Sequence, residues 1–362
     1  MNAKVETHLL PIADLDNDRR LAAYDDPQGL LTLSAAHRRL LQTDPFVSDF
    51  GKPALIFGTF GNRVVGKTEP VYFEIKADGR VMDAQASGGL FVEESYRKTL
   101  YAVELMARQD SLTDSGVSLN TGLSLSAQKL AKMMGYKLFP IARFALVKHS
   151  ADLLKERVSP ARCRFLAPFF DCAFWFHRTI LSLCLAVRTC GWRFERVNPS
   201  DGRALDDFAR LVEAAIDRLG EHVTAKWLKW VVENDFFGEA RKSIWRCTKG
   251  DKTVGYCLVR TDNGKTGRGK VLEWQVAPEF QGKESMFLLK TAQMLLKECD
   301  LVVVSLGPCL PAARQLSKLL LRLPAQVVSL GVAKKSPLRE LPGWDDPGNW
   351  RIRPCVGDAC FY

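Results

Sequence analysis

The order of apolar and polar positions repeats in two blocks along the chain. In the first block, segments rich in Ile, Val, Phe and Tyr, broken by Gly and Pro, predict β-strands. Two other segments have apolar positions at helical spacing, among them Tyr96, Leu100 and Val103. The predicted strands are 53–60, 70–77, 79–92 (bulged at Gly88 and Gly89), 116–122 and 139–148, and the predicted helices are 93–109 and 124–136, the latter capped by Ser124 or Ser126 and ended at Gly135.

The second block begins after the turn-rich segment "RVNPSDGR" and repeats this order. Gly-Asp and Asn-Gly pairs separate three apolar segments, as in β-hairpins. The predicted helices are 204–220, 222–234, one that begins near Met286, and 310–324; the predicted strands are three within 243–278 and one at 300–307. Because a helix follows each of the two late strands, we expect an α/β (mixed α+β) protein with two tandem domains. Each domain would have a mostly antiparallel mixed sheet with helices on both faces.

The segment between the blocks is rich in aromatic and basic residues. It reads "RCRFLAPFFDCAFWFHRTILSLCLAVRTCGW" over 162–192, and Asp171, His177 and Arg178 interrupt its apolar character. The longest uninterrupted run, 179–187, is far shorter than the ~20 residues that a membrane-spanning helix needs. We therefore favour a buried helix that joins the two domains. The alternative is a helix that lies on a membrane surface, since arginines flank aromatic anchors.

Composition and charge narrow the choice of partner. The 362 residues are 47% hydrophobic and 25% charged, with a net charge of +10. The basic residues are spread along the chain without a nucleic-acid-binding motif, so we expect no nucleic-acid partner and instead an anionic ligand such as a nucleotide-like cofactor. The ten cysteines form no C-x-x-C pair, which argues against structural zinc or a disulfide framework. The first twenty residues lack an apolar signal core, so we expect a cytoplasmic protein.

Two loops have the form of a phosphate-binding turn between a strand and a helix. One is "VAPEFQGKESM" at 276–286, and the other lies in "FVEESYRKTLYAVELM" at 91–106. Backbone N–H groups at a helix N-terminus bind phosphate, and glycines let the backbone approach it closely. Both segments, together with "SLNTGLSLSAQKLAKMMGYK", resemble the GNAT superfamily of acyl-CoA-dependent N-acyltransferases, in which an Arg/Gln-x-x-Gly-x-Gly/Ala loop holds the CoA pyrophosphate.

This resemblance covers 40–150 and 200–362, and it implies two tandem GNAT-like domains. Residues 1–39 would then be an N-terminal segment, and 151–199 an aromatic and basic helical connector. The strings "GKVLEW" and "WRIRPCVGDACFY" also resemble two-domain GNAT proteins encoded with bacterial exopolysaccharide genes. The implied activity is acyl transfer from acetyl-CoA or another acyl-CoA to an amine, without a metal. The acceptor would be an amino sugar or another precursor of cell-surface polysaccharide.

Both loops depart from the pyrophosphate pattern. Leu100 replaces a glycine in the first loop, while Glu284 and Met286 replace both glycines in the second. A carboxylate beside a diphosphate repels it, so the first loop is the better candidate for the cofactor, and either loop can instead be a plain strand–helix connection. The candidate cofactor-binding residues are Arg97, Lys98, Thr99, Leu100 and Ala102 in the first loop and Gln281, Gly282 and Lys283 in the second.

The resemblance also implies catalytic residues. The family commonly places a carboxylate on the strand before the pyrophosphate loop, and Glu273 and Asp83 hold this position in the two blocks. A tyrosine after the next helix serves as the acid, and Tyr136 has that place. For each residue a structural role is the alternative: a solvent-facing or lysine-paired carboxylate, or a core aromatic ring. Two other functions stay open, a Fem-type aminoacyltransferase that uses aminoacyl-tRNA and a non-catalytic binding or scaffold protein with degenerate CoA sites.

Overall fold

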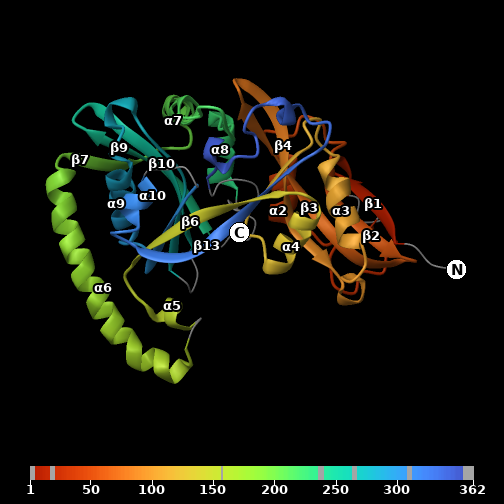
Figure 1. Ribbon diagram of the computed structural model, residues 1–362, viewed down its shortest axis with the longest axis horizontal. Coiled ribbons are helices and arrows are strands. Elements are labelled where there is room, and N and C mark those ends of the chain that lie inside the picture. Colours follow the sequence, from red (N-terminus) through yellow and green to blue (C-terminus); the bar gives the residue numbers. More distant parts are fainter. Residues whose placement is uncertain are drawn as a thin grey trace.

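The computed structural model describes residues 5–16, 21–155, 158–234, 240–262, 267–307 and 312–353. Within these ranges, fourteen strands form one mixed sheet that extends through the molecule (Figure 1). The strands are β1 (Glu6–Pro11), β2 (Pro53–Phe60), β3 (Arg63–Ala77), β4 (Arg80–Val92), β5 (Val117–Asn120), β6 (Lys137–Val147), β7 (Trp192–Arg196), β8 (Leu219–Glu221), β9 (Ala240–Lys249), β10 (Lys252–Asp262), β11 (Arg268–Val276), β12 (Leu301–Leu306), β13 (Leu321–Val332) and β14 (Trp350–Arg351). The helices are α2 (Ala35–Gln42), α3 (Tyr101–Asp110), α4 (Leu125–Met133), α5 (Ala151–Lys155), α6 (Pro160–Arg188), α7 (Gly202–Ala214), α8 (Ala225–Glu233), α9 (Glu284–Leu295) and α10 (Ala312–Leu316).

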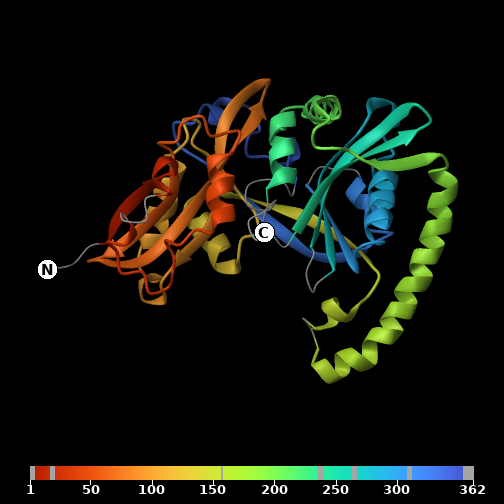
Figure 2. The same ribbon diagram turned by 180° about the vertical axis from the view of Figure 1, so that it is seen from behind.

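The two halves of the chain exchange their closing strands. Along the sheet the order is β1-β2-β3-β4-β5-β13-β6-β12-β11-β10-β9-β7. β6, from the first half, pairs with β12, while β13, from the second half, pairs with β5. β6 and β13 also pair with each other, and Figures 1 and 2 show them crossing between the halves. Each half therefore completes its sheet with a strand from the other, and main-chain hydrogen bonds join the two.

Each half contains one pair of parallel strands that diverge. β4 and β5 share a single paired position, Gln85 with Ser118. β11 and β12 pair only over 268–271 and 301–304, so the carboxyl end of β11 continues without β12 beside it. The other principal neighbours in both halves are antiparallel. Each divergence opens the sheet just before a strand-to-helix loop.

Helices cover both faces of the sheet in each half, as the sequence predicted. In the second half, Phe208 of α7 stacks on Tyr256 of β10 on one face of the sheet. The next residue, Cys257, belongs to a different core cluster, which includes residues of α9. The first cluster also contains Leu40 of α2, so it spans both halves of the molecule. Trp230 Nε1 in α8 donates a hydrogen bond of 3.1 Å to Thr43 Oγ1, which ties the halves together at this face.

The predicted bounds of β2, the bulge in β4 and the two ends of α4 are confirmed. β2 has the predicted bounds, and the register of β4 shifts at its glycine pair, where Gly89 has a φ of 58°. Ser124 caps α4 by accepting from Ala127 N, and Gly135 follows its end with a φ of 81°. The Asn-Gly turn predicted after β10 lies outside the described residues.

Three predicted helices are shorter than expected. Residues 93–100 form a 3-10 turn and a loop, so α3 begins only at Tyr101. The helix predicted over 204–220 ends at Ala214, and β8 follows. The helix predicted over 310–324 was wrong beyond Leu316, since its last residues start β13. In this last case, the apolar run "LLLRLP" suits either a helix or a strand, and pairing with β6 decides for the strand.

The expectation of a buried helix between the halves was wrong. The 29-residue helix α6 buries only Cys163, Leu181 and Leu185 among its described side chains. Figure 2 shows it along one side of the molecule, at the outer edge of the second half. By length and composition alone it could cross a membrane, and only 11% of its most apolar 18-residue stretch is buried.

Candidate functional site

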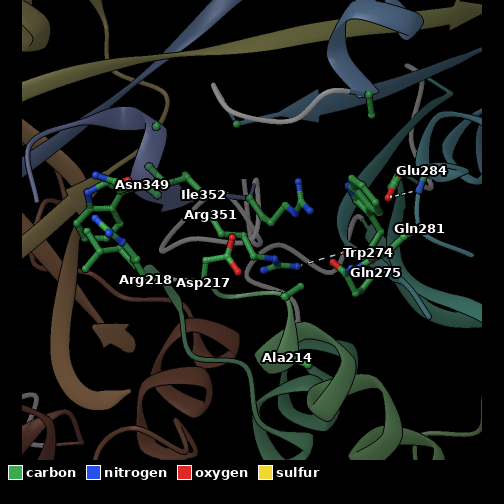
Figure 3. A pocket seen from close by; sticks show the side chains of 18 residues that line it. Ala214, Asp217, Arg218, Trp274, Gln275, Gln281, Glu284, Asn349, Arg351 and Ile352 are labelled. Carbon is green, nitrogen blue, oxygen red and sulfur yellow. Dashed lines mark hydrogen bonds between the residues drawn. The ribbon is translucent and has the colours of Figure 1, made fainter. Parts of the chain in front are cut away.

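The loop after β11 places a helix N-terminus beside the divergence of β11 and β12. A 3-10 turn, η3 (Pro278–Phe280), leads through Gly282, whose φ of 82° is easily adopted only by glycine, to the start of α9. The first N–H groups of a helix lack intrahelical acceptors and carry partial positive charge. Glu284 Oε1 accepts a hydrogen bond of 2.9 Å from Gly282 N–H (Figure 3), so a carboxylate already occupies one donor of this loop.

A cavity of about 580 Å³ opens at this helix N-terminus, and we name it the loop cavity. Its wall combines the loop, the ends of β11 and β12, the end of α7 and the segment around β14 (Figure 3). The lining residues with polar or aromatic groups include Asp217, Arg218, Trp274, Gln275, Gln281, Glu284, Asn349, Trp350, Arg351 and Arg353. Three arginines and two carboxylates thus give the wall a net positive charge, which suits an anionic ligand.

Glu273, the predicted base of the second half, is fully buried behind this wall. Arg351 Nη2 donates to Glu273 Oε1 at 2.7 Å, Arg351 Nη1 lies 3.3 Å from Oε2, and Trp274 N–H donates to Oε1 at 2.7 Å. Arg353 Nε lies 3.6 Å from Glu273 Oε1, and its guanidinium stacks 4.2 Å from the centre of the Trp274 ring. The carboxylate is therefore paired with arginine, rather than solvent-facing or paired with lysine.

A second buried carboxylate, Glu221, completes the cluster. Its Oε1 accepts from Arg353 N–H at 2.8 Å. Burial and, to a smaller extent, the nearby charge of Glu273 raise the pKa of Glu221 to about 8, against the opposing effect of Arg351 and Arg353. Glu221 Oε2 and Trp274 Nε1 are buried without a hydrogen-bond partner among the described residues. Perturbed pKa values and unpartnered polar atoms of this kind concentrate at functional sites.

A second cavity is also lined by residues of β11 and β12, and we name it the strand cavity. It has a volume of about 460 Å³ and is lined by β6, β11, β12 and β13 together with the segment between β5 and α4. Arg143, Lys270, Ser305 and Gln326 give it a polar and basic lining. Leu272 lines the strand cavity and Trp274 lines the loop cavity. Glu273 therefore lies between residues that face two cavities.

Among the described residues, the loop of the first half lines neither of these two cavities. Arg97, which is exposed, donates from Nε to Val92 O at 2.9 Å, and Thr99 accepts from Tyr101 N–H at 3.2 Å. Lys98 is exposed, Ala102 is partly buried, and Leu100 is 75% exposed. The Tyr101 ring fills the space above Gly58, where an added Cβ would lie 1.6 Å from the Tyr101 hydroxyl. The contacts of Arg97, Thr99 and Tyr101 are thus those of a strand–helix connection whose middle residues are exposed.

Polar side chains fill the divergence between β4 and β5. Gln109 Nε2 donates to Ala86 O at 2.9 Å, and Gln85 Nε2 donates to Gln109 O. Asn120 Oδ1 accepts from Ser87 N–H at 2.5 Å, which bridges the two strands directly. In the first half, side-chain amides thus fill the gap between β4 and β5. In the second half, the corresponding gap between β11 and β12 lies beside a cavity.

The other two predicted catalytic residues have local partners. The Tyr136 hydroxyl donates to Asp110 Oδ2, and burial together with the Asp110 charge raises the pKa of Tyr136. Asp83 accepts from Asp114 N–H and Ser115 N–H, both at 3.0 Å, and so holds the turn before β5. Neither residue lines the loop cavity or the strand cavity. Their catalytic roles stay predictions.

Of the predicted set, Gln281 and Gly282 line the loop cavity, and Glu273 lies behind it, paired with the lining residue Arg351. Lys283 is the N-cap of α9, with its ammonium over the Phe280 ring at 5.6 Å. Sequence reasoning missed Glu221, Arg351 and Arg353. The alternating "WRIRP" could have signalled arginines on one face of a strand, but their partners are 78 and 132 residues away in the chain.

Comparison with solved structures identifies the fold. A GCN5-related N-acetyltransferase from Kribbella flavida has 18% identity and a TM-score of 0.50, over 91% of this chain and 71% of its own. A tandem GNAT protein from the clavulanic acid biosynthesis pathway has 14% identity and a TM-score of 0.51, over 92% and 100%. N-myristoyltransferase of Saccharomyces cerevisiae with bound myristoyl-CoA has 9% identity and a TM-score of 0.52, over 91% and 83%.

The sequence itself matches no protein-family model and no curated protein. The structural likeness therefore establishes the fold, and the prediction of a tandem GNAT architecture is confirmed.

Proposed function

We propose, from the premise that the chain has the tandem GNAT fold, that it is an acyl-CoA-dependent N-acyltransferase whose second half holds the acyl-CoA. The observation that carries the proposal is the loop cavity, which lies at the N-terminus of α9 and beside the divergence of β11 and β12. In the described part of the first half, by contrast, side chains bridge the divergence of β4 and β5. This reverses the preference that the loop sequences alone suggested.

The residues of the loop cavity suit an anionic cofactor, provided that Glu284 moves away. Backbone N–H groups at the start of α9, the amide of Gln281 and the guanidinium of Arg218 are available to phosphate oxygens. Glu284 opposes this binding, so its carboxylate must leave Gly282 N–H when a phosphate arrives. An acyl-CoA, acetyl-CoA in the simplest case, would supply an activated thioester there.

The buried carboxylates are the candidates for proton transfer. An amine acceptor must lose a proton before it attacks, and a group with a pKa near neutrality accepts that proton best. Glu273 has a neighbour in each cavity wall, Leu272 and Trp274, and Glu221, whose pKa is raised to about 8, lies close to it. We assign proton acceptance to this pair, with Arg351 and Arg353 holding the charge in place.

The strand cavity is the proposed entry for the amine acceptor. Leu272, the neighbour of Glu273 on β11, lines it, and its basic lining favours an acceptor that also carries negative charge. We propose an amino sugar or another amine-bearing precursor of cell-surface polysaccharide, supported only by the resemblance of "GKVLEW" and "WRIRPCVGDACFY" to such proteins.

A non-catalytic acyl-CoA-binding protein is the second candidate, and two observations favour it. The carboxylate of Glu284 blocks a loop donor, and Arg351 neutralises Glu273. Both would be expected in a protein that retained the fold and lost the reaction.

A thiol-release assay with acetyl-CoA and a panel of amines separates the two candidates. The enzyme releases CoA only when a suitable amine is present, and Glu273→Gln lowers kcat roughly a hundredfold or more. Glu279→Gln, on the exposed part of the same loop, is the matched control and keeps the parent rate. Binding of acetyl-CoA without amine-dependent release for any amine would favour the non-catalytic protein.

A further inference from the structure

Helix α6 carries an exposed apolar stripe along its length. At about 100° per residue, the spacing of its members confines them to an arc of roughly 80°. The stripe consists of Phe165, Phe169, Cys172, Phe176, Ile180, Leu183 and Val187. Phe165 is 69% exposed and Val187 is 81% exposed, so both ends of the stripe face away from the protein. No charged residue lies on this arc between Phe165 and Val187.

The opposite face of α6 is fixed to the second half. Leu181 and Leu185 are buried in the core that contains α9, and Gln293 Nε2 donates to Ser182 Oγ at 2.9 Å. Nearer the middle of the helix, Asp171 Oδ1 accepts from Ser150 N–H at 2.6 Å. Because β7, which follows α6, pairs with β9, the helix is held by the same globular body near its middle and at its end. The helix therefore lies along the surface, and a membrane-crossing orientation is inconsistent with these contacts.

Basic residues flank the stripe at both ends. Arg162 and Arg164 are exposed at the start of α6, and Arg188 and Arg193 are exposed at and beyond its end. Over residues 158–196 the chain has six arginines and only two carboxylates, Asp171 and Glu195. Glu195 is bound to Arg246, and Asp171 lies on the inner side of the helix. The ends of the stripe are thus positive, while its centre is apolar and aromatic.

This charge distribution distinguishes between the possible occupants of the stripe. In a pair of α6 helices from two copies of the chain, arginines would face arginines whether the helices ran parallel or antiparallel. An anionic lipid surface instead neutralises both ends and accepts the apolar stripe below its headgroups. We propose that α6 docks the protein on an anionic membrane, with the helix in the plane of the interface and the stripe inserted.

Flotation of the full chain with lipid vesicles tests the proposal. The parent protein should float with vesicles of phosphatidylglycerol and phosphatidylcholine, and much less with phosphatidylcholine alone. Phe169→Glu with Phe176→Glu should lower the partition coefficient by at least about tenfold, since each removes an aromatic ring that would insert into the membrane and adds a charge. Leu125→Glu is the matched control: its side chain is 76% exposed on α4, far from the stripe in sequence, and it should float like the parent.

Sedimentation equilibrium and circular dichroism complete the test. The double variant should keep the parent's helix content and mass, because its substituted side chains are exposed. No flotation of the parent at low salt, or equal flotation of the double variant, would overturn the proposal. If the parent were a dimer that does not bind vesicles, and the double variant were a monomer, the stripe would instead join two copies of the chain.

Discussion

Arg351 and Glu273 form a buried, two-pronged ion pair across 78 residues of sequence. The side chains are 7% and 0% exposed, and the shorter of the two contacts is 2.7 Å. The pair joins the segment at β14 to the end of β11, where β11 and β12 have separated. It therefore positions the candidate base and also closes the inner wall of the loop cavity.

Arg351→Met is expected to destabilise the protein strongly. It leaves the Glu273 carboxylate buried without its main partner, which should lower the free energy of unfolding by about 3–5 kcal/mol. Arg246→Met is the matched control, because it breaks an Arg–Glu pair that is 38% and 52% exposed, and should cost at most about 1 kcal/mol. Denaturant titration measures both. An equal effect of the two substitutions would contradict a special role for the buried pair.

Adding Glu273→Gln to Arg351→Met should recover part of the lost stability, since it removes the unpaired charge. The recovered part, measured in a double-mutant cycle, gives the coupling between the two side chains. Strictly additive effects would mean that they do not interact.

Glu284→Ala is expected to strengthen the binding of CoA. The substitution releases Gly282 N–H and removes a negative charge, and a gain of about 1 kcal/mol corresponds to roughly fivefold tighter binding. Glu279→Ala, in the same loop but without this hydrogen bond, controls for net charge. Calorimetry on both variants gives the comparison, and equal affinities would show that Glu284 does not compete with the ligand.

Glu221 should make stability decrease as the pH rises. Its pKa is about 8 in the folded protein against 4.5 ordinarily, so between these values the folded state binds a proton that the unfolded state has lost. Glu221→Gln should remove this dependence, so that its stability relative to the parent increases between pH 5 and 8 by more than about 1 kcal/mol. Thermal unfolding over this range measures the difference, and parallel pH profiles would contradict the raised pKa.

Tyr136→Phe is expected to affect stability rather than turnover. The hydroxyl donates to Asp110, whose other oxygen accepts from Ser118 Oγ at 2.7 Å, and removing a buried donor should cost about 1–3 kcal/mol. The kcat of the variant should stay close to the parent value, since Tyr136 lines neither cavity. A large loss of kcat with unchanged stability would restore its predicted role as the acid.

Local elements of this fold could be predicted because their signals are local. β2, the bulge at Gly89 and the cap at Ser124 follow from residue types within a few positions. The exchange of β6 and β13 could not be predicted, since either strand could close its own half with the same pattern of apolar residues. The exposure of α6 was missed because an aromatic helix is usually buried, and only the tertiary structure shows which face is covered.

The candidate site divides in the same way. The strand and loop that carry Glu273 and Gln281 could be located from their order in the chain. Glu221 has no local signal, because it lies in a three-residue strand and acquires its raised pKa only from burial beside Glu273. The filling of the first divergence by Gln85, Gln109 and Asn120 likewise depends on contacts between separate elements.

Calorimetric titration with acetyl-CoA tests the central claim, that the second half holds the cofactor. The parent protein should bind, Gln281→Glu should weaken binding about tenfold or more by placing a carboxylate at the loop, and Arg97→Glu should bind like the parent. Loss of binding in Arg97→Glu alone would place the cofactor in the first half. Absence of binding by the parent at millimolar acetyl-CoA would contradict the proposed function.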